Sequence, residues 1–223
     1  FTYYLGFKVN SGEYKLMGLA PYGKPVHTQL IWDHLVDLKE DGSFRLNLDY
    51  FDYCAGLRMT NQKFSDLFGG APRDPESVPT QRDMDLAASI QVVTEEIIIK
   101  LARQLKKDTG ADYLCLAGGV ALNCVANGRL LREGIFKDIW IQPAAGDAGG
   151  ALGAAYAAYH TYRKQPRVYV PGVDQMQGSL LGPHYEQADI VAKLDELSHR
   201  PPRSVHGGGV RDDPSRHFHG HER

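Results

Sequence analysis

The stretch 113–162, YLCLAGGVALNCVANGRLLREGIFKDIWIQPAAGDAGGALGAAYAAYHTY, decides the fold because one local pattern occurs in it twice. An apolar run, first 113–117 and then 138–141, leads into a glycine-bearing turn, and helix-compatible residues follow at 120–133 and 148–162. We expect the first run to be a buried strand. Two successive strand–turn–helix units predict an α/β domain with helices on the faces of a sheet and ligands at the carboxyl ends of the strands.

The first glycine turn is Gly118-Gly119. Adjacent glycines allow a positive φ and let backbone N–H groups approach a ligand, and the N-terminus of the following helix favours a phosphate or another anion. Taken alone, a tight turn that needs no ligand explains the pair about as well.

The second turn, GDAGG at 146–150, places one acid among small residues. Asp147 could be the N-cap of the following helix, which is the ordinary role of a single Asp there. Gly149 and Gly150 each cost up to about 1 kcal/mol against Ala in a helix, so the pair favours close approach of a ligand or of another backbone. A carboxylate at this point can ligate a hard cation or orient a phosphate through one. The two turns together predict two walls of one cleft.

Two further polar features are candidates for the same cleft. Lys15, in EYKLMGLAPYG, could meet a phosphate as a point charge or be a solvated surface lysine. Asn123 and Asn127 lie four residues apart on one helix face and could bond a ribose or base, or make polar contacts between helices. Arg129, Arg132 and Glu133 are typical of a solvated face.

The clearest remaining element is a helix over 81–107. Thr80 can cap it together with Asp83, and apolar residues recur in it at steps of three or four. For the rest of the chain we expect a strand over 1–9, an ordered loop over 13–25, a short helix or strand over 31–38, a strand over 44–48, an irregular surface loop over 51–79 and a short helix over 186–198.

Composition narrows the functional class. Lys and Arg total 25 against 27 Asp and Glu, so the chain lacks the basic character that nucleic-acid binding requires, and 43% hydrophobic residues can supply a core. Of the three cysteines, Cys115 and Cys124 lie in apolar segments, which predicts buried thiols in a reducing compartment. No apolar run is long enough for a membrane span. We expect a cytoplasmic protein.

Three longer motifs extend these patterns: LGFKVNSGEYKLMGLAPYGKP (5–25), CLAGGVALNCVANGRLL (115–131) and IWIQPAAGDAGGALGAA (139–155). In this order they resemble the O-carbamoyltransferases of nodulation and antibiotic biosynthesis. The resemblance implies the second lobe of an actin-like ATPase (ribonuclease H-like) domain, with a mixed sheet flanked by helices. It also implies the activity of that family, in which carbamoyl phosphate and ATP give a carbamoyl-adenylate whose carbamoyl group passes to a hydroxyl of a small-molecule acceptor.

The resemblance also assigns expected roles to individual residues. Asp147 would be a ligand of a divalent metal, iron with magnesium as the alternative, that touches the nucleotide phosphate. No catalytic residue is identified. The expected nucleotide-binding residues are Gly118, Gly119, Val120 and Asn123 on the adenosine side, Gly149 and Gly150 at the phosphate, and Lys15 and Gly18 on the loop that faces it.

The chain departs from the family pattern at both ends. The family's metal-binding histidines would precede Phe1, so we expect residues 1–164 to be the second lobe, 165–199 a linker and the start of a truncated C-terminal domain, and 200–223 a disordered or aberrant tail. Such a fragment should be inactive alone. Two alternatives remain: a relative of the enzymes that make threonylcarbamoyl-adenosine in transfer RNA, and a non-catalytic nucleotide-binding module.

Overall fold

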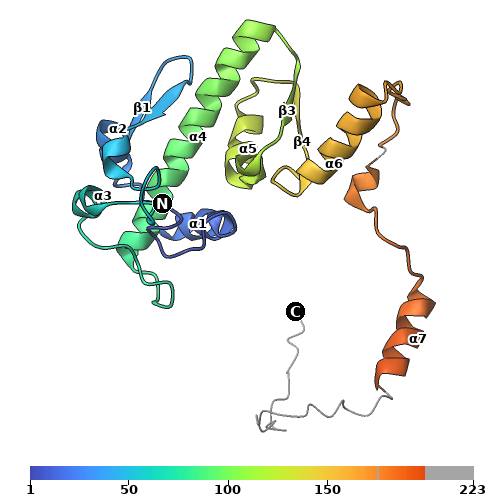
Figure 1. Ribbon diagram of the computed structural model, residues 1–223, viewed down its shortest axis with the longest axis horizontal. Coiled ribbons are helices and arrows are strands. Elements are labelled where there is room, and N and C mark those ends of the chain that lie inside the picture. Colours follow the sequence, from blue (N-terminus) through green and yellow to red (C-terminus); the bar gives the residue numbers. More distant parts are fainter. Residues whose placement is uncertain (175, 199–223) are drawn as a thin grey trace. The chain divides into compact units, whose positions relative to one another are not determined.

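A computed structural model describes residues 1–174 and 176–198 of the chain (Figure 1). It separates into two units, residues 1–169 and the part that begins at Val170. The predicted tail at 200–223 lies outside the described residues. The first unit contains short helices, an antiparallel pair of strands and a parallel pair of strands. The predicted α/β class is therefore confirmed, although these strands form two separate sheets where one mixed sheet was expected.

The long helix α4 (Gln81–Thr109) is the central element of the first unit (Figure 1). The hydroxyl of Thr80 accepts a hydrogen bond from the Asp83 backbone N–H, and the Asp83 carboxylate accepts one from the Thr80 N–H, so the expected cap is a complete capping box. Gly110 ends the helix in the left-handed conformation, with φ 65°. The helix predicted over 81–107 is confirmed and extends two residues further.

Short elements cover the N-terminal half of α4. Their buried side chains, among them Tyr4, Ile31, Leu35 and Phe64, form one hydrophobic cluster with Leu86 and Val93 of α4. The elements are α1 (Glu13–Leu19), the 3-10 turn η1 (Ala20–Tyr22), α2 (Thr28–His34), the antiparallel strands β1 (Val36–Leu38) and β2 (Phe44–Leu46), the 3-10 turn η2 (Leu48–Tyr50) and α3 (Gln62–Leu67). The short helix or strand expected over 31–38 is the end of α2 followed by β1.

Three predictions for this half were wrong. Residues 1–9 form no strand but contain a turn at 2–6 and begin another at 9–11, because hydrogen bonds such as that from Leu5 N–H to the Phe1 carbonyl fold the segment and bury Tyr4 and Leu5 against α4. The expected loop at 13–25 contains α1, with Gly18 inside it. The expected surface loop at 51–79 contains α3, which Asn61 caps and whose Phe64 is fully buried.

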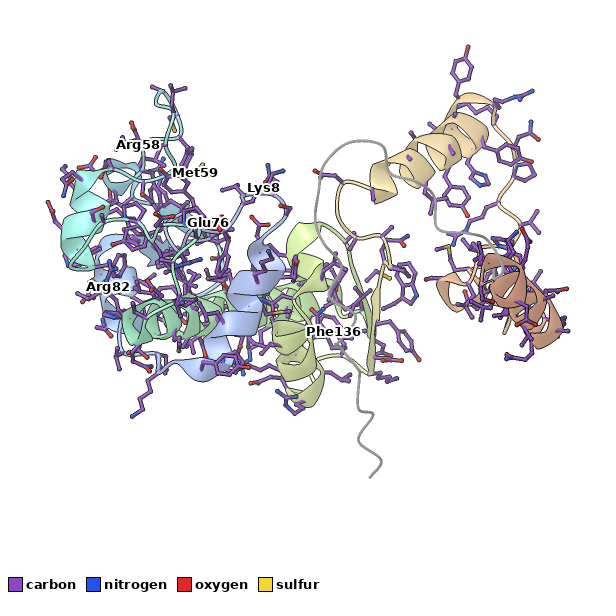
Figure 2. All side chains as sticks on the ribbon, turned by 90° about the horizontal axis from the view of Figure 1, so that it is seen from below. Lys8, Arg58, Met59, Glu76, Arg82 and Phe136 are labelled. Carbon is purple, nitrogen blue, oxygen red and sulfur yellow. The ribbon has the colours of Figure 1, made fainter. Side chains whose placement is uncertain are left out.

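The C-terminal half of α4 supports the parallel pair. Strand β3 (Tyr113–Leu116) pairs in register with β4 (Asp138–Ile141), and the 3-10 turn η3 (Gly119–Leu122) and helix α5 (Cys124–Arg132) connect them. The two predicted strands are thus confirmed. A second hydrophobic cluster consists of Ile99, Ala102, Leu114, Leu130 and Phe136 (Figure 2 labels Phe136).

Only one face of this sheet is buried, which corrects two predictions. The pleat turns Tyr113 and Cys115 outward, so the strand that we expected to be buried has an exposed face. Cys54, Cys115 and Cys124 are all exposed, so the expected buried thiols are wrong. Cys124 is the first residue of α5, and its Sγ lies 3.9 Å from the Met17 Sδ.

The predicted Ala-rich helix at 148–162 is α6 (Gly149–Tyr156) continued by a π-helical turn, η4 (Ala157–Tyr162), and neither part has a buried residue. The second unit contains the short 3-10 turn η5 (Gln177–Ser179) and helix α7 (Gln187–Ser198), which confirms the helix expected over 186–198. No helix in the described ranges is both long enough and apolar enough to cross a bilayer.

Arg82, which Figure 2 labels, lies in the first turn of α4 and contacts the N-terminal turns. Its Nε donates to the Phe68 carbonyl at 2.9 Å, and its Nη2 donates to the Gly70 carbonyl at 3.2 Å and to the Tyr4 hydroxyl. One guanidinium thus connects three segments that are distant in the sequence.

Arg82→Met should therefore lower the free energy of unfolding by about 2 kcal/mol, because the Phe68 and Gly70 carbonyls each lose a charged hydrogen-bond donor. The substitution keeps an aliphatic side chain of similar length. Arg103→Met is the matched control on the same helix, since Arg103 is 59% exposed and forms one ion pair with Glu133; its cost should stay under about 0.5 kcal/mol. Urea unfolding of both variants measures this. Equal losses in the two variants would contradict the role given to Arg82.

Candidate functional site

A cavity of about 510 Å³ lies between the N-terminal segment, the middle of α4 and both glycine turns. Its lining is mainly apolar, with a few amides and hydroxyls and with two carboxylates. The lining residues are Asn10, Ser11, Glu13, Tyr14, Leu16, Met17, Ala87, Ile90, Gln91, Thr94, Gly119, Val120, Leu122, Asn123, Gly146 and Asp147. No Lys or Arg is among these described residues.

The two glycine turns meet in the structure. The Gly118 N–H donates to the Ala145 carbonyl at 2.8 Å, which joins the turn after β3 directly to the turn after β4. Gly118 has φ +96°, a conformation that residues with a side chain rarely adopt. Gly119 and Gly146 then line the same cavity. The two walls that the repeated pattern predicts are therefore adjacent, on the side of the carboxyl ends of both strands.

Asp147 lies at this cavity with an exposed side chain. It is not the N-cap of α6, because the helix begins at Gly149, its N-cap is Ala148, and no side chain caps it. The helix-cap interpretation of Asp147 is thus wrong. Glu13, on the opposite element α1, is the other carboxylate of the lining, and it accepts a hydrogen bond from the Asn10 N–H at 2.9 Å.

The glycines after Asp147 have two different environments. A Cβ on Gly149 would lie 2.1 Å from the Ala144 carbonyl oxygen, so the close approach of another backbone explains this glycine. A Cβ on Gly150 would meet nothing within 4 Å. The N–H groups of both residues donate within the turn, to the carbonyls of Gly146 and Asp147. Of these two glycines, only Gly150 has open space where a Cβ would lie.

Other predicted site residues lie outside the lining. Lys15 and Gly18 are exposed on α1, and neither borders the cavity, although their neighbours Leu16 and Met17 do. Gly118, which is exposed, does not line the cavity either, although its neighbour Gly119 does. Val120, which is 60% exposed, does line the cavity. The structure thus brings Gly119, Val120, Asn123 and Asp147 together at one cavity, and their binding roles stay predictions.

Asn123 has partners within the fold. Its side-chain oxygen accepts the Ala126 N–H at 3.0 Å and so caps α5, and its amide pairs with the amide of Gln91 on α4. Asn127 is buried and donates to the Ala121 carbonyl at 2.7 Å. The predicted polar contact between helices is therefore found at Asn123. The side chain of Asn127 instead bonds the 3-10 turn η3, which precedes its own helix.

Gln91 was not among the predicted site residues, although one feature of the sequence indicated it. It is a polar residue beside the core-facing positions Ile90 and Val93 of α4, and it is only 9% exposed. Arg129 was also assigned wrongly to a solvated face, because its guanidinium bonds Glu96 at 2.6 Å and Glu95 at 3.4 Å, which raises its pKa above the ordinary value.

The donor set for a metal is incomplete in this part of the chain. Within the described residues no group of three or more His, Cys, Asp or Glu side chains could hold a metal ion. Asp147 offers one hard oxygen ligand, whereas cations such as Mg²⁺ need several. The residues present therefore do not by themselves fit a metal centre.

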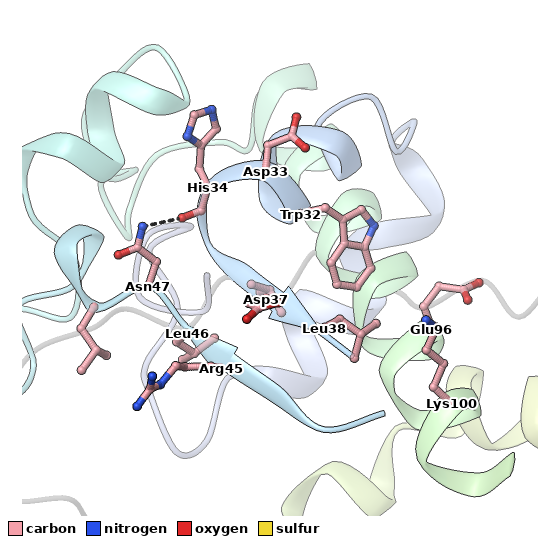
Figure 3. Close-up of a pocket in the computed structure, with 12 residues that line it drawn as sticks. Trp32, Asp33, His34, Asp37, Leu38, Arg45, Leu46, Asn47, Glu96 and Lys100 are labelled. Carbon is pink, nitrogen blue, oxygen red and sulfur yellow. Dashed lines mark hydrogen bonds between the residues drawn. The ribbon is translucent and has the colours of Figure 1, made fainter. Parts of the chain in front are cut away.

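A second, open groove of about 1050 Å³ lies over the β1–β2 hairpin and α4 (Figure 3). Trp32, Leu38, Glu96 and Lys100 face it from α2, β1 and α4, and Asp37 and Arg45 come from the two strands. Lys100 pairs with Glu40, and Glu96 pairs with Arg129, so two of the charged residues of the groove have ion-pair partners within the fold.

Comparisons with known proteins agree with the motifs. The family model for the carbamoyltransferase N-terminus matches residues 1–156. An uncharacterized protein of Synechocystis is 64% identical over 194 residues, 87% of this chain and 31% of the relative. Nodulation protein NolNO of Sinorhizobium fredii is 42% identical over 67% of this chain and 20% of its own length. Nodulation protein NolO of Bradyrhizobium diazoefficiens is 42% identical over 63% of this chain and 24% of its own length. The chain thus spans less than a third of each of these relatives.

The different environments of the paired glycines give a test of the turn. In Gly149→Ala the new methyl must displace the Ala144 carbonyl, which should weaken the adjoining Gly118–Ala145 hydrogen bond and speed exchange of the Gly118 amide by about tenfold. Gly150→Ala is the control, because its methyl enters open space and replaces a poor helix former. Amide hydrogen exchange measures both. Unchanged Gly118 exchange in Gly149→Ala would refute this link between the turns.

Proposed function

This chain belongs to the carbamoyltransferase family, and we propose that it forms part of the nucleotide-binding lobe of an ATP-dependent O-carbamoyltransferase. The observation that carries the proposal is the meeting of the two glycine turns, through Gly118 and Ala145, at a cavity that Asp147 also lines. We propose that this unit is the second lobe of an actin-like ATPase domain and that the longer protein supplies the facing lobe.

The cavity suits a nucleoside better than a fully charged ligand. Its volume of about 510 Å³ lies within the usual range of small-molecule sites, and Leu16, Met17, Ile90 and Leu122 provide apolar contacts for a flat base. The same cavity is lined by Gly119, Val120 and Asn123, beside which the proposal places the adenosine. The phosphates would extend toward the turn at 146–150, where Gly150 leaves open space.

The phosphate side needs positive charge that the lining does not supply. Glu13 and Asp147 would repel a triphosphate, since no described lining residue is basic. We propose that Asp147 contributes one ligand to a divalent metal, iron or magnesium, whose other ligands come from outside the described residues. Such a cation stabilises negative charge on phosphate oxygens. Lys15 and Gly18, on the exposed face of α1, would meet the phosphates only if that face borders the bound nucleotide in the longer protein.

The chemistry proposed for the whole protein is carbamoyl transfer from carbamoyl phosphate through carbamoyl-adenylate to a hydroxyl of a small acceptor. In the transfer step the hydroxyl oxygen forms a bond to the carbamoyl carbon, the bond from that carbon to the AMP oxygen breaks, and the hydroxyl proton is lost. Binding in a cavity that excludes water would protect this mixed anhydride from hydrolysis. The described residues identify no base for the hydroxyl proton.

Titration of ATP into the longest natural protein that contains this chain tests the nucleotide site. With Mg²⁺ or Fe²⁺ present, Asp147→Ala should weaken ATP binding by about tenfold, roughly 1.4 kcal/mol, because a metal ligand is lost. In a chelating buffer the same substitution should leave ATP affinity unchanged or higher, because it removes a repelling carboxylate. Asp66→Ala, which alters an exposed acid on α3, is the matched control.

Each outcome of this titration decides something. Equal weakening of ATP binding by Asp147→Ala with and without divalent cations would reject the metal-ligand role. Absence of ATP binding in the unsubstituted protein would reject the nucleotide site itself. ATP binding without carbamoyl transfer to any acceptor hydroxyl would favour the non-catalytic nucleotide-binding module.

A further inference from the structure

A reciprocal amide pair forms one border of the cavity. Gln91 of α4 donates through Nε2 to the Asn123 Oδ1 at 3.2 Å, and Asn123 donates through Nδ2 to the Gln91 Oε1 at 3.0 Å. Both residues line the cavity, and Gln91 is only 9% exposed. The pair joins the middle of α4 to the start of α5.

A carboxylate fixes the orientation of the Gln91 amide. Nε2 of Gln91 also donates to Glu95 Oε1 at 2.9 Å, one turn further along α4, and Glu95 is paired with Arg129. An ionised carboxylate only accepts hydrogen bonds, so the nitrogen of the Gln91 amide must face it. Both N–H groups of Gln91 are then used, one by Glu95 and one by Asn123.

The orientation of the Asn123 amide is fixed by the Ala126 backbone N–H together with Gln91. Its Oδ1 accepts two hydrogen bonds, from Gln91 Nε2 and from the Ala126 backbone N–H at 3.0 Å. An amide oxygen has two lone pairs, so its acceptor capacity is used. Nδ2 has two N–H groups, and one of them donates to Gln91. One donor therefore remains for a ligand.

We propose that Gln91 is a positioning residue that makes Asn123 a donor only, so the ligand atom that contacts Asn123 must be a hydrogen-bond acceptor. This inference rests on the proposed function, in which a nucleotide occupies this cavity with its adenosine beside Asn123. The acceptors that adenosine offers are the ring nitrogens of adenine and the ribose oxygens. A ligand N–H placed at the same point would lose its water partner without gaining an acceptor.

Single-acceptor analogues of ATP test the inference in the longest natural protein that contains this chain. The probes are 1-deaza-, 3-deaza- and 7-deaza-ATP, which replace one ring nitrogen by C–H, with 2′-deoxy- and 3′-deoxy-ATP. One of these analogues should bind about tenfold more weakly than ATP, as expected for one lost hydrogen bond next to a donor left unpaired.

Two variants separate donation by Asn123 from positioning by Gln91. Asn123→Asp keeps the acceptor for Ala126 and for Gln91 but cannot donate, so the tenfold ratio between ATP and the critical analogue should fall below about twofold. Gln91→Leu frees one lone pair and one N–H of Asn123, so the same ratio should fall to less than half its unsubstituted value. Because the ratio is taken within each protein, changes in overall stability or charge cancel.

Gln104→Leu is the matched control for Gln91→Leu. Gln104 lies on the same helix and donates to Asp108 at 2.7 Å, the same four-residue spacing as Gln91 and Glu95, yet it does not line the cavity. Its analogue ratio should equal that of the unsubstituted protein. If ATP binds but every analogue binds equally well, or if the ratio survives in Asn123→Asp or Gln91→Leu, the inference is overturned while the nucleotide site stands. If ATP does not bind, both fail.

Discussion

Both hydrophobic clusters of the first unit depend on packing against one helix, α4. Leu86, Ala87 and Val93 join the cluster under the N-terminal turns, whereas Ile99 and Ala102 join the cluster under the parallel strands. The first cluster therefore holds α4 from Leu86 to Ile97, and the second holds it from Ile98 to Ala102. The cavity lies against the stretch from Ala87 to Thr94, in the part of α4 that packs into the first cluster. A wall held by a packed hydrophobic cluster suits a preorganised binding site.

The cavity combines an apolar interior with an acidic opening. Ile90, Leu16 and Met17 offer dispersion contacts, while Glu13 and Asp147 add two negative charges. For a nucleotide this would separate two contributions to binding: the base would gain from leaving water, and the phosphates would need a counter-charge from a cation or from residues that do not line this cavity. Sequence motifs alone would not show this imbalance, since Lys15 suggested a basic partner that the structure places on the outside of α1.

Local signals account for the predictions that were right. The capping box at Thr80 and the apolar stripe of α4 involve residues within a few positions of one another, and so do the two strand–turn–helix units. Several of the errors concern distant partners, whereas the missed helices α1 and α3 and the cap given to Asp147 are local errors. The Tyr4 hydroxyl accepts a hydrogen bond from Arg82, which lies 78 residues further along the chain. Asn123 is paired with Gln91, which lies 32 residues before it. The exposure of Cys115 depends on which face of β3 the helices cover, and a short apolar run does not specify that face.

Helix α6 begins two residues after Asp147 and, like the π-helical turn that follows it, has no buried side chain. The Asp147 turn is thus attached on one side to strand β4 and on the other to a segment without buried side chains. Fixing such a segment costs conformational entropy, about 1–2 kcal/mol for each residue ordered. Part of the intrinsic affinity of this turn for a ligand would therefore be offset by ordering, and any surface that packs on α6 would raise that affinity without touching the ligand.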